Sequence, residues 1–373
     1  MHDNPLMRRA IVHIGMPRTA TTTLQRLLFE LRHSLPDRGI LYPELTPRSA
    51  AEPHLNHQHL GEALDGRRPR RERTELLDAL GRMLATTEAD VVLLSYEGLS
   101  LIPGSAVARH LAGFFGRFGF AMETLVTVKP QGSNINSLYT HAMQFLKEPR
   151  PFRPFFDSVI GNRRLDYEAA IQPWRAASNG RIRAVALRAP GSDQPIAARV
   201  LQELDLLDRV RDLLTERDLA RVENPSPGPY MIEAARQLRL RGLHAGFGCP
   251  ARDVTRYLEK AAQESGLDGT RFHGLNAACL EQVETRYTPA NERFARTVWG
   301  ESWQRRVAAD EPGLVNELAA RRLDPAETAD VDRLVRLACT EFGVRARTTP
   351  FRRLFPVVAV PRAVLRRARR LLP

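Results

Sequence analysis

The sequence predicts an α/β fold in which helices flank both faces of a central parallel sheet, followed by a mainly helical second half. Short apolar runs rich in β-branched residues alternate with segments whose apolar residues recur at helical spacing. The predicted strands are 10–14, 40–42, 91–94, 123–128 and 182–187. The helical patterns between them are 21–35, 75–85, 107–118, 134–146 and 167–177. In such folds, ligands bind at the carboxyl ends of the strands.

After residue 195 the patterns are almost purely helical. The segments are 195–221, 228–242, 251–265, 274–286, 291–299 and 325–341. We therefore expect an α/β domain over 1–305 (mainly helical from 195), a helical extension over 306–349, and a basic amphipathic tail over 350–373. Residues 44–73 are polar and rich in His, Pro and Arg, which predicts a surface excursion with little regular structure, and three prolines predict a loop at 149–154.

The positive charge of the chain is unevenly distributed. The 373 residues have a net charge of +12, of which residues 350–373 supply seven arginines and no acid. The other 349 residues therefore carry only +5. A mildly basic body without aromatic-studded basic stripes or zinc-finger spacing does not indicate a nucleic-acid groove, although it favours smaller anionic partners.

Cysteine usage and hydropathy indicate a cytoplasmic protein. Cys249, Cys279 and Cys339 are far apart, odd in number and show no metal-ligand pattern, so we expect a reducing compartment. The apolar stretch 10–16 contains His13 and has no small-residue cleavage site after it, so we interpret it as a strand rather than a signal peptide. No uninterrupted apolar run approaches the roughly 18–20 residues of a membrane span.

The segment that follows the first predicted strand predicts an anion site. It reads Gly15-Met16-Pro17-Arg18-Thr19-Ala20-Thr21-Thr22-Thr23. Glycine allows a sharp turn, and the next helix begins with unpaired N–H groups and the positive end of its dipole, which suit a phosphate or sulfate. Arg18 and the threonine hydroxyls add donors. The segment lacks the Gly-Lys-Ser/Thr of a Walker A loop. The alternative interpretation is an ordinary helix capped by a threonine.

This segment resembles the 5′-phosphosulfate-binding loop of the sulfotransferase family, whose usual form is Gly-x-Pro-Lys-Thr-Gly-Thr-Thr-x-Leu. Arg18 stands at the lysine position and Ala20 at the position of the second glycine. Arg18 keeps the positive charge but is bulkier and a less compact proton donor. Ala20 would be strained if the backbone has a positive φ there.

A second feature has the family's spacing. In the family, a basic residue at the end of a later strand and a serine eight positions on bind the donor's 3′-phosphate. Lys129 follows the strand predicted at 123–128, in place of the usual arginine, and Ser137 lies eight positions later. A cation at a strand end and a hydroxyl on the next helix can converge on one phosphate. The alternative is an exposed lysine and a routine helix serine.

Weaker similarity to bacterial members of the family extends over roughly residues 8–303. It rests on Leu165-Asp166-Tyr167 with Trp174, on Asn224-Pro225-Ser226-Pro227, and on Tyr287 with Asn291-Glu292-Arg293-Phe294-Ala295. The resemblance implies a P-loop-type three-layer fold and a nucleotide donor, 3′-phosphoadenosine 5′-phosphosulfate. It also implies transfer of the sulfuryl group to a hydroxyl acceptor without a metal.

In family members, a His or Glu base lies near a strand end between the two donor-binding motifs. Here that place holds Glu97, which we expect to be the base, with a pKa raised by partial burial. The alternative is a helix N-terminal acid or an ion-pair partner. His54, His57 and His59 are rival candidates, for metal or for the acceptor, although a solvated loop is expected there. His13 is expected to be a packed residue.

The resemblance assigns the remaining roles. Backbone N–H groups of the loop that runs from Pro17 through Thr19 and Ala20 to Thr22 would hold the 5′-phosphosulfate, with help from the hydroxyls of Thr21 and Thr22. Arg18 would stabilise the leaving oxygen, and Lys129 and Ser137 would hold the 3′-phosphate. Arg293 or Arg296 could reach the adenosine phosphate, but the alternative is surface arginine. The acceptor pocket is expected from loops 44–73 and 147–164 and the helical half, where Arg150, Arg153, Arg163 and Arg164 suggest something anionic or hydroxyl-rich.

The tail and the departures from the family pattern leave alternatives open. Residues 362–372 place apolar residues on one helical face and arginines on the other, which fits peripheral contact with the inner face of an anionic membrane and a carbohydrate or glycolipid acceptor. A disordered basic end and a docked helix fit equally well. An active sulfotransferase competes with a sulfotransferase-like binding protein that has lost catalysis, and with another P-loop phosphotransferase.

Overall fold

A computed structural model describes residues 8–221 and 226–343, so the expectations for the tail at 350–373 lie outside the described residues. Five strands form one sheet: β1 (Arg9–His13), β2 (Ile40–Leu41), β3 (Val91–Ser95), β4 (Ala121–Val128) and β5 (Ile182–Ala186). Their order is β2-β3-β1-β4-β5, and every neighbouring pair is parallel. The predicted parallel α/β sheet is confirmed.

Helices make up most of the rest. They are α1 (Thr21–Leu31), α2 (Gln58–Leu64), α3 (Arg70–Thr86), α4 (Ala106–Gly116), α5 (Gln131–Gln144), α6 (Phe152–Val159), α7 (Tyr167–Ala177), α8 (Ile196–Glu203), α9 (Leu207–Val210), α10 (Glu216–Ala220), α11 (Pro229–Leu240), α12 (Ala251–Glu264), α13 (Ala277–Trp299), α14 (Trp303–Arg306) and α15 (Pro325–Glu341). A short 3₁₀ helix, η2 (Glu97–Leu101), follows β3.

Alternation along β1 divides the sheet into two apolar faces. Ala10, Val12 and Ile14 belong to a core shared with α3, α4 and α7, whereas Ile11 belongs to a core shared with α1, α8 and α9. Successive strand residues point to opposite faces, so a strand apolar on both sides must be covered on both sides. The result is a three-layer arrangement.

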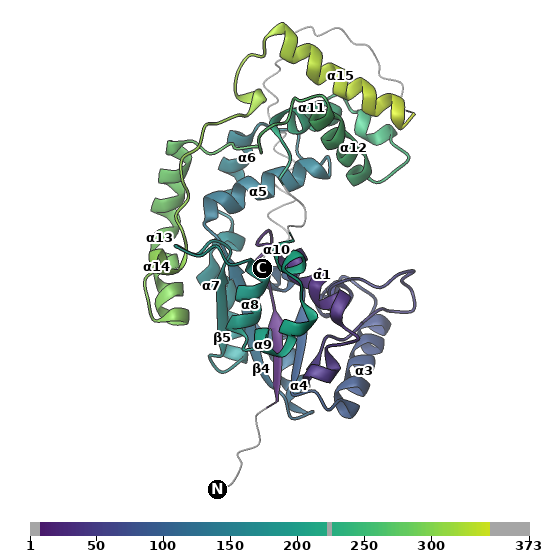
Figure 1. Cartoon of the computed structure of the whole chain (residues 1–373), viewed down its shortest axis with the longest axis vertical. Coiled ribbons are helices and arrows are strands. Elements are labelled where there is room, and N and C mark those ends of the chain that lie inside the picture. The colour runs from purple at the N-terminus through teal and green to yellow at the C-terminus, as the bar shows by residue number, and fades with distance from the viewer. Residues whose placement is uncertain (1–7, 222–225, 344–373) are drawn as a thin grey trace, which may run out of the picture.

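A third core lies beyond the carboxyl ends of the strands. It joins apolar side chains of α5, α6, α11, α12 and α15 with the first half of α13. Figure 1 shows these helices gathered above the sheet. α13 connects the two regions, because Val283 and Tyr287 pack in the helical core while Phe294 and Ala295 pack against the sheet.

Several predicted elements differ from the observed ones. Residues 44–57 contain no helix or strand, as predicted, but α2, whose His59, Leu60 and Ala63 are buried, and the start of α3 follow, so the prediction of little regular structure was wrong for 58–73. The single helix at 195–221 is divided into α8, α9 and α10, with Asp205 in the left-handed region (φ 61°) between the first two. The two helices at 274–286 and 291–299 are one helix that contains Pro289.

The predicted loop at 149–154 is also shorter than expected. Pro151 is the N-cap of α6 and Pro154 lies in its first turn. Proline is tolerated there because first-turn N–H groups have no intrahelical partner in any case. Among the described helices, none is long and apolar enough to cross a membrane.

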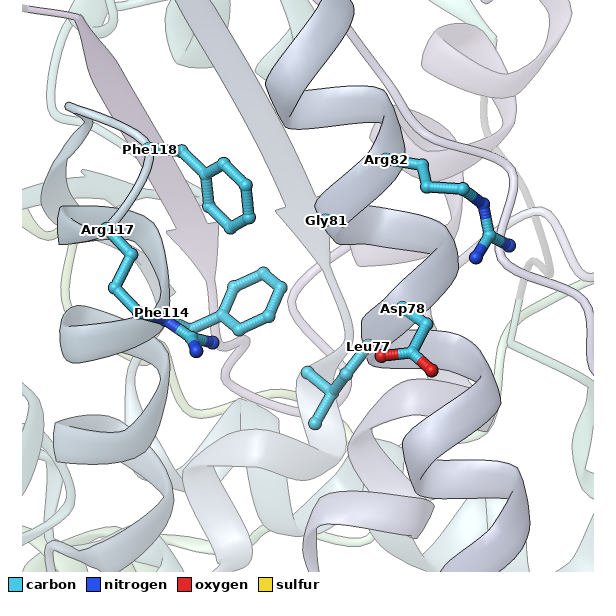
Figure 2. Close-up of a pocket in the computed structure, with 7 residues that line it drawn as sticks. All are labelled: Leu77, Asp78, Gly81, Arg82, Phe114, Arg117 and Phe118. Atoms are coloured by element: carbon cyan, nitrogen blue, oxygen red, sulfur yellow. The ribbon is translucent and has the colours of Figure 1, made fainter.

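A cavity of about 340 Å³ lies between α3 and α4, and Figure 2 shows the rings of Phe114 and Phe118 facing Gly81 across it. α3 and α4 both end just before strands begin, at Val91 and Ala121. The cavity is therefore near the amino ends of the strands, at the edge opposite to the one where α/β folds bind ligands.

Candidate anion-binding site

The β1–α1 loop (residues 14–20) crosses the carboxyl end of the sheet and is tied to its neighbours. Met16 N donates to Thr127 O at 2.9 Å, and Thr127 N donates to Gly15 O at 2.6 Å. Asn134 Nδ2 of α5 donates to Pro17 O at 3.3 Å. The loop therefore lies between the ends of β1 and β4, with the start of α5 beside it.

The loop turns into α1 through residues with positive φ. Gly15 has φ 111°, Arg18 has φ 67° and Ala20 has φ 60°. Ala20 is the N-cap of α1. A methyl group cannot accept a hydrogen bond, so the first turn of α1 has no side-chain cap. Thr23 N donates to Ala20 O at 3.1 Å. The N–H groups of Thr21 and Thr22 precede it and are the ones that a bound anion could use. The alternative of a threonine cap is wrong. The left-handed conformation expected to strain Ala20 is present, at a cost of about 1 kcal/mol.

A buried polar network supports the loop from the sheet side. Thr19 Oγ1 lies 2.6 Å from Thr127 Oγ1 and also bonds Met16 O. His13 Nδ1 lies 2.8 Å from Ser95 Oγ, its partner in the β1–β3 register. Burial lowers the pKa of His13 to about 4. His13 is thus a packed, neutral residue, as expected.

Glu97 lies directly against the loop. A Cβ added to Gly15 would be 3.0 Å from Glu97 Cβ and 3.1 Å from Glu97 Cα. Gln25 Nε2 of α1 donates to Glu97 Oε2 at 3.0 Å and to Ser95 Oγ at 3.1 Å. Asn56 Nδ2 donates to Gln25 Oε1 at 3.3 Å. The half-buried carboxylate of Glu97 is therefore oriented by an amide that two neighbours hold in place.

The structure brings Lys129 and Ser137 together. Lys129 Nζ, directly after the end of β4, donates to Ser137 Oγ of α5 at 2.7 Å. Lys129 is only 5% exposed, so the alternative of an exposed lysine is wrong. Burial, with smaller contributions from the charges of Arg18 and Arg188, lowers the pKa of Lys129 to about 7, while Asp310 opposes the shift. A buried cation beside other cations is stabilised by an anion.

Arg18 extends the positive region to the last turn of α5. Arg18 Nη1 lies 3.3 Å from His141 Nδ1. Burial and the charge of Arg252 lower the pKa of Arg18, while Glu97 raises it. The pKa of His141 is lowered to about 4 by burial and by Arg18 and Arg252. The imidazole is therefore neutral near pH 7 and can accept a hydrogen bond from Arg18.

Asp310 comes from the segment expected to be a separate extension. Its carboxylate accepts hydrogen bonds from Ser133 N (3.0 and 3.1 Å) and from Ser133 Oγ, at the amino end of α5. Burial raises the pKa of Asp310, and bonds to the first turn of α5 oppose this shift. Asp310 thus caps the helix that carries Ser137 and supplies a negative charge to Lys129.

The remaining candidates lie elsewhere or have other partners. His57 is buried, accepts from Ser95 N at 2.9 Å and bonds Pro43 O at 2.8 Å, and His59 is buried, so the expectation of solvated histidines was wrong for both. Arg293 and Arg296 are exposed on α13. Arg150 pairs with Glu148 and Arg153 pairs with Asp157.

Sequence reasoning missed Gln25, His141, Arg252 and Asp310. Each lies on a helix or connection whose register and path depend on tertiary packing. A partial signal existed for Gln25, because it is flanked by Leu24, Leu27 and Leu28 on a helix that starts at the loop. Asp310 and Arg252 gave no signal. Asp310 is 181 residues from Lys129 along the chain and Arg252 is 234 residues from Arg18, so no local pattern relates them.

Within residues 8–221 and 226–343, no group of three or more His, Cys, Asp or Glu side chains is placed to hold a metal ion. Comparison of the chain with protein-family models and with curated proteins gave no match.

Proposed function

We propose that this protein is a sulfotransferase that transfers the sulfuryl group of 3′-phosphoadenosine 5′-phosphosulfate to a hydroxyl acceptor. The observation that carries the proposal is the convergence of three features at one edge of the sheet. These are the β1–α1 loop with its uncapped helix, the buried Lys129–Ser137 pair, and Glu97 against Gly15. Along the chain the loop comes first, Glu97 second and the Lys129–Ser137 pair third, which is the order that the sequence resemblance implies.

Each feature has a chemical role in this reaction. The acceptor oxygen attacks sulfur in line, a new S–O bond forms, and the bond from sulfur to the 5′-phosphate oxygen breaks. Glu97 takes the acceptor proton. The N–H groups of the loop and Arg18 stabilise the charge that develops on the leaving phosphate. Lys129 and Ser137 hold the 3′-phosphate and so fix the donor.

Nucleotide titration tests the donor class. We expect 3′-phosphoadenosine 5′-phosphate to bind without a divalent cation, more tightly than ATP with magnesium. Isothermal titration calorimetry with both nucleotides measures the difference. A preference for ATP with magnesium would instead favour a phosphotransferase, and tight binding without transfer to any hydroxyl acceptor would favour a protein that has lost catalysis.

The variant Glu97→Gln tests the base. The amide cannot take a proton at neutral pH, so transfer should fall by a factor of about 10²–10⁴. Nucleotide affinity should not weaken, because the change removes a negative charge near Arg18. The matched control is Glu52→Gln, an exposed glutamate in the loop before α2. Transfer by Glu97→Gln at a rate near that of the parent would exclude Glu97 as the base.

A further inference from the structure

α12 brings a cation from the helical region to the loop side of the site. Thr255 Oγ1 of α12 donates to Gln144 O at 2.7 Å, where α5 ends, and this bond is buried. Arg252 lies three residues before Thr255, on the same face of α12. His141 lies in the last turn of α5. The packing of α12 on α5 therefore sets Arg252 near His141.

The electrostatics agree with this placement. The charge of Arg252 acts on both Arg18 and His141. Arg18 contacts His141 directly, at 3.3 Å. Two guanidinium groups from different parts of the fold lie near one neutral imidazole, while the carboxylates of Glu259 and Glu97 each act on one of them with the opposite sign. A buried cation whose pKa is lowered by a second cation favours a negatively charged group beside it. Guanidinium groups bind carboxylate, sulfate and phosphate with paired hydrogen bonds.

This region differs from the one assigned to the 3′-phosphate. The charges that act on Lys129 belong to Arg18, Asp310 and Arg188, whereas those that act on Arg18 belong to Arg252 and Glu97. Ser137 precedes His141 by four residues, about 6 Å along the helix axis. The charge of Arg252 thus acts on Arg18 and His141, whereas the Lys129–Ser137 pair assigned to the 3′-phosphate has other charged neighbours.

We propose that Arg252, with His141 beside it, binds an anionic group of the acceptor. The acceptor is then a hydroxyl compound that also carries a carboxylate, sulfate or phosphate group. This inference rests on the proposed function, because it takes Glu97 as the base and the loop as the donor site. On this proposal the acceptor presents its hydroxyl to Glu97 and its anionic group to Arg252.

The first test uses inorganic sulfate as the probe. The full chain is saturated with 3′-phosphoadenosine 5′-diphosphate, whose terminal phosphate fills the position of the sulfuryl group. Sulfate is then titrated at constant ionic strength while the melting temperature is followed. Arg252→Gln should weaken the apparent sulfate affinity at least tenfold, and Arg252→Lys should retain part of it. The control is Arg256→Gln on the same helix, which should change it less than twofold.

The second test measures selectivity. In transfer reactions that contain a glucuronate-bearing saccharide and its glucose counterpart, the parent should prefer the anionic acceptor and Arg252→Gln should lose that preference. The inference is overturned if Arg252→Gln and the parent bind sulfate equally, or if Arg252→Gln weakens nucleotide binding instead. Failure of the parent to bind the nucleotide would contradict the proposed function. The sulfate titration, repeated without nucleotide, would still show whether Arg252 binds an anion.

Discussion

Gly15 shows how a single backbone position controls the site. Its φ of 111° disfavours any other residue, and an added Cβ would press on the backbone and Cβ of Glu97 at 3.0–3.2 Å. We expect Gly15→Ala to lower the free energy of unfolding by about 2–3 kcal/mol, because strain and the displacement of Glu97 both contribute. Urea unfolding measures this loss. The matched control is Gly113→Ala in α4, where the new methyl group meets nothing within 4 Å and should stabilise the helix. Equal effects of the two substitutions would contradict the account of Gly15.

Lys129 gives the site a characteristic pH dependence. Its pKa of about 7 in the free protein means that most molecules lose this charge above pH 8. In the proposed function the 3′-phosphate of the nucleotide binds the protonated form of Lys129, and phosphate itself is almost fully charged above pH 7. Nucleotide affinity should therefore fall by close to tenfold for each pH unit above about 7.5. Lys129→Arg keeps its charge over this range, so its affinity should be flat between pH 7 and pH 9 in calorimetric titrations. A flat profile in the parent would be the contrary result.

At this scale, the sequence was informative where chemistry depends on chain neighbours. Gly15 and Arg18 could be chosen because they lie in one short segment, and Lys129 and Ser137 because one strand end and the next helix fix their spacing. Gln25 gave only a partial signal, its place on the apolar face of α1, because its contact with Glu97 depends on how α1 packs against the end of β3.

The α3–α4 pair offers a test of packing at the scale of elements. Gly81 lies in the interior of α3 beside the cavity shown in Figure 2, and an added Cβ would be 3.2 Å from Phe118 Cζ. Phe118 is half-buried next to open space, so its ring can move by the few tenths of an ångström required. We expect Gly81→Ala to raise the free energy of unfolding by about 0.5–1 kcal/mol through helix propensity. Denaturant unfolding of Gly81→Ala, with Gly113→Ala measured in parallel, checks this. A lower free energy of unfolding for Gly81→Ala than for the parent would mean that the Phe118 ring cannot move.

Element boundaries were predicted well where apolar periodicity and burial agree. α7 and α15 begin and end where the pattern predicted, because each presents a regular apolar stripe to a core. α2 was missed because its buried residues include a histidine and a glycine, and Gly61 is buried for close contact with Tyr96. From composition alone, such a segment is predicted to be a polar loop.

For the whole molecule, local patterns predicted the layers but not how the helical region meets the sheet. That arrangement depends on α13, which packs in two cores, and on the path of 307–317, which returns Asp310 to the start of α5. Contacts separated by more than 150 residues leave no periodic trace in a single sequence. The proposed site lies at this junction, so the contribution that we propose for Arg252 and His141 could not be predicted from the sequence.

Buried neutral histidines give the whole molecule a predictable sensitivity to acid. His57 is fully paired, its Nδ1 accepting from Ser95 N while its other nitrogen bonds Pro43 O, and burial lowers its pKa to about 4. An unfolded histidine titrates near 6.5, so the stability contributed by the neutral ring is complete above pH 6.5 and is lost as the pH falls towards 4. At pH 5 this loss is about 2 kcal/mol for His57.

The variant His57→Gln tests this. The glutamine side chain offers an acceptor and a donor and does not titrate. Its free energy of unfolding should therefore fall by about 2 kcal/mol less than that of the parent between pH 8 and pH 5 in urea titrations. Identical pH dependence in the two proteins would mean that His57 takes up a proton in the folded state near its ordinary pKa.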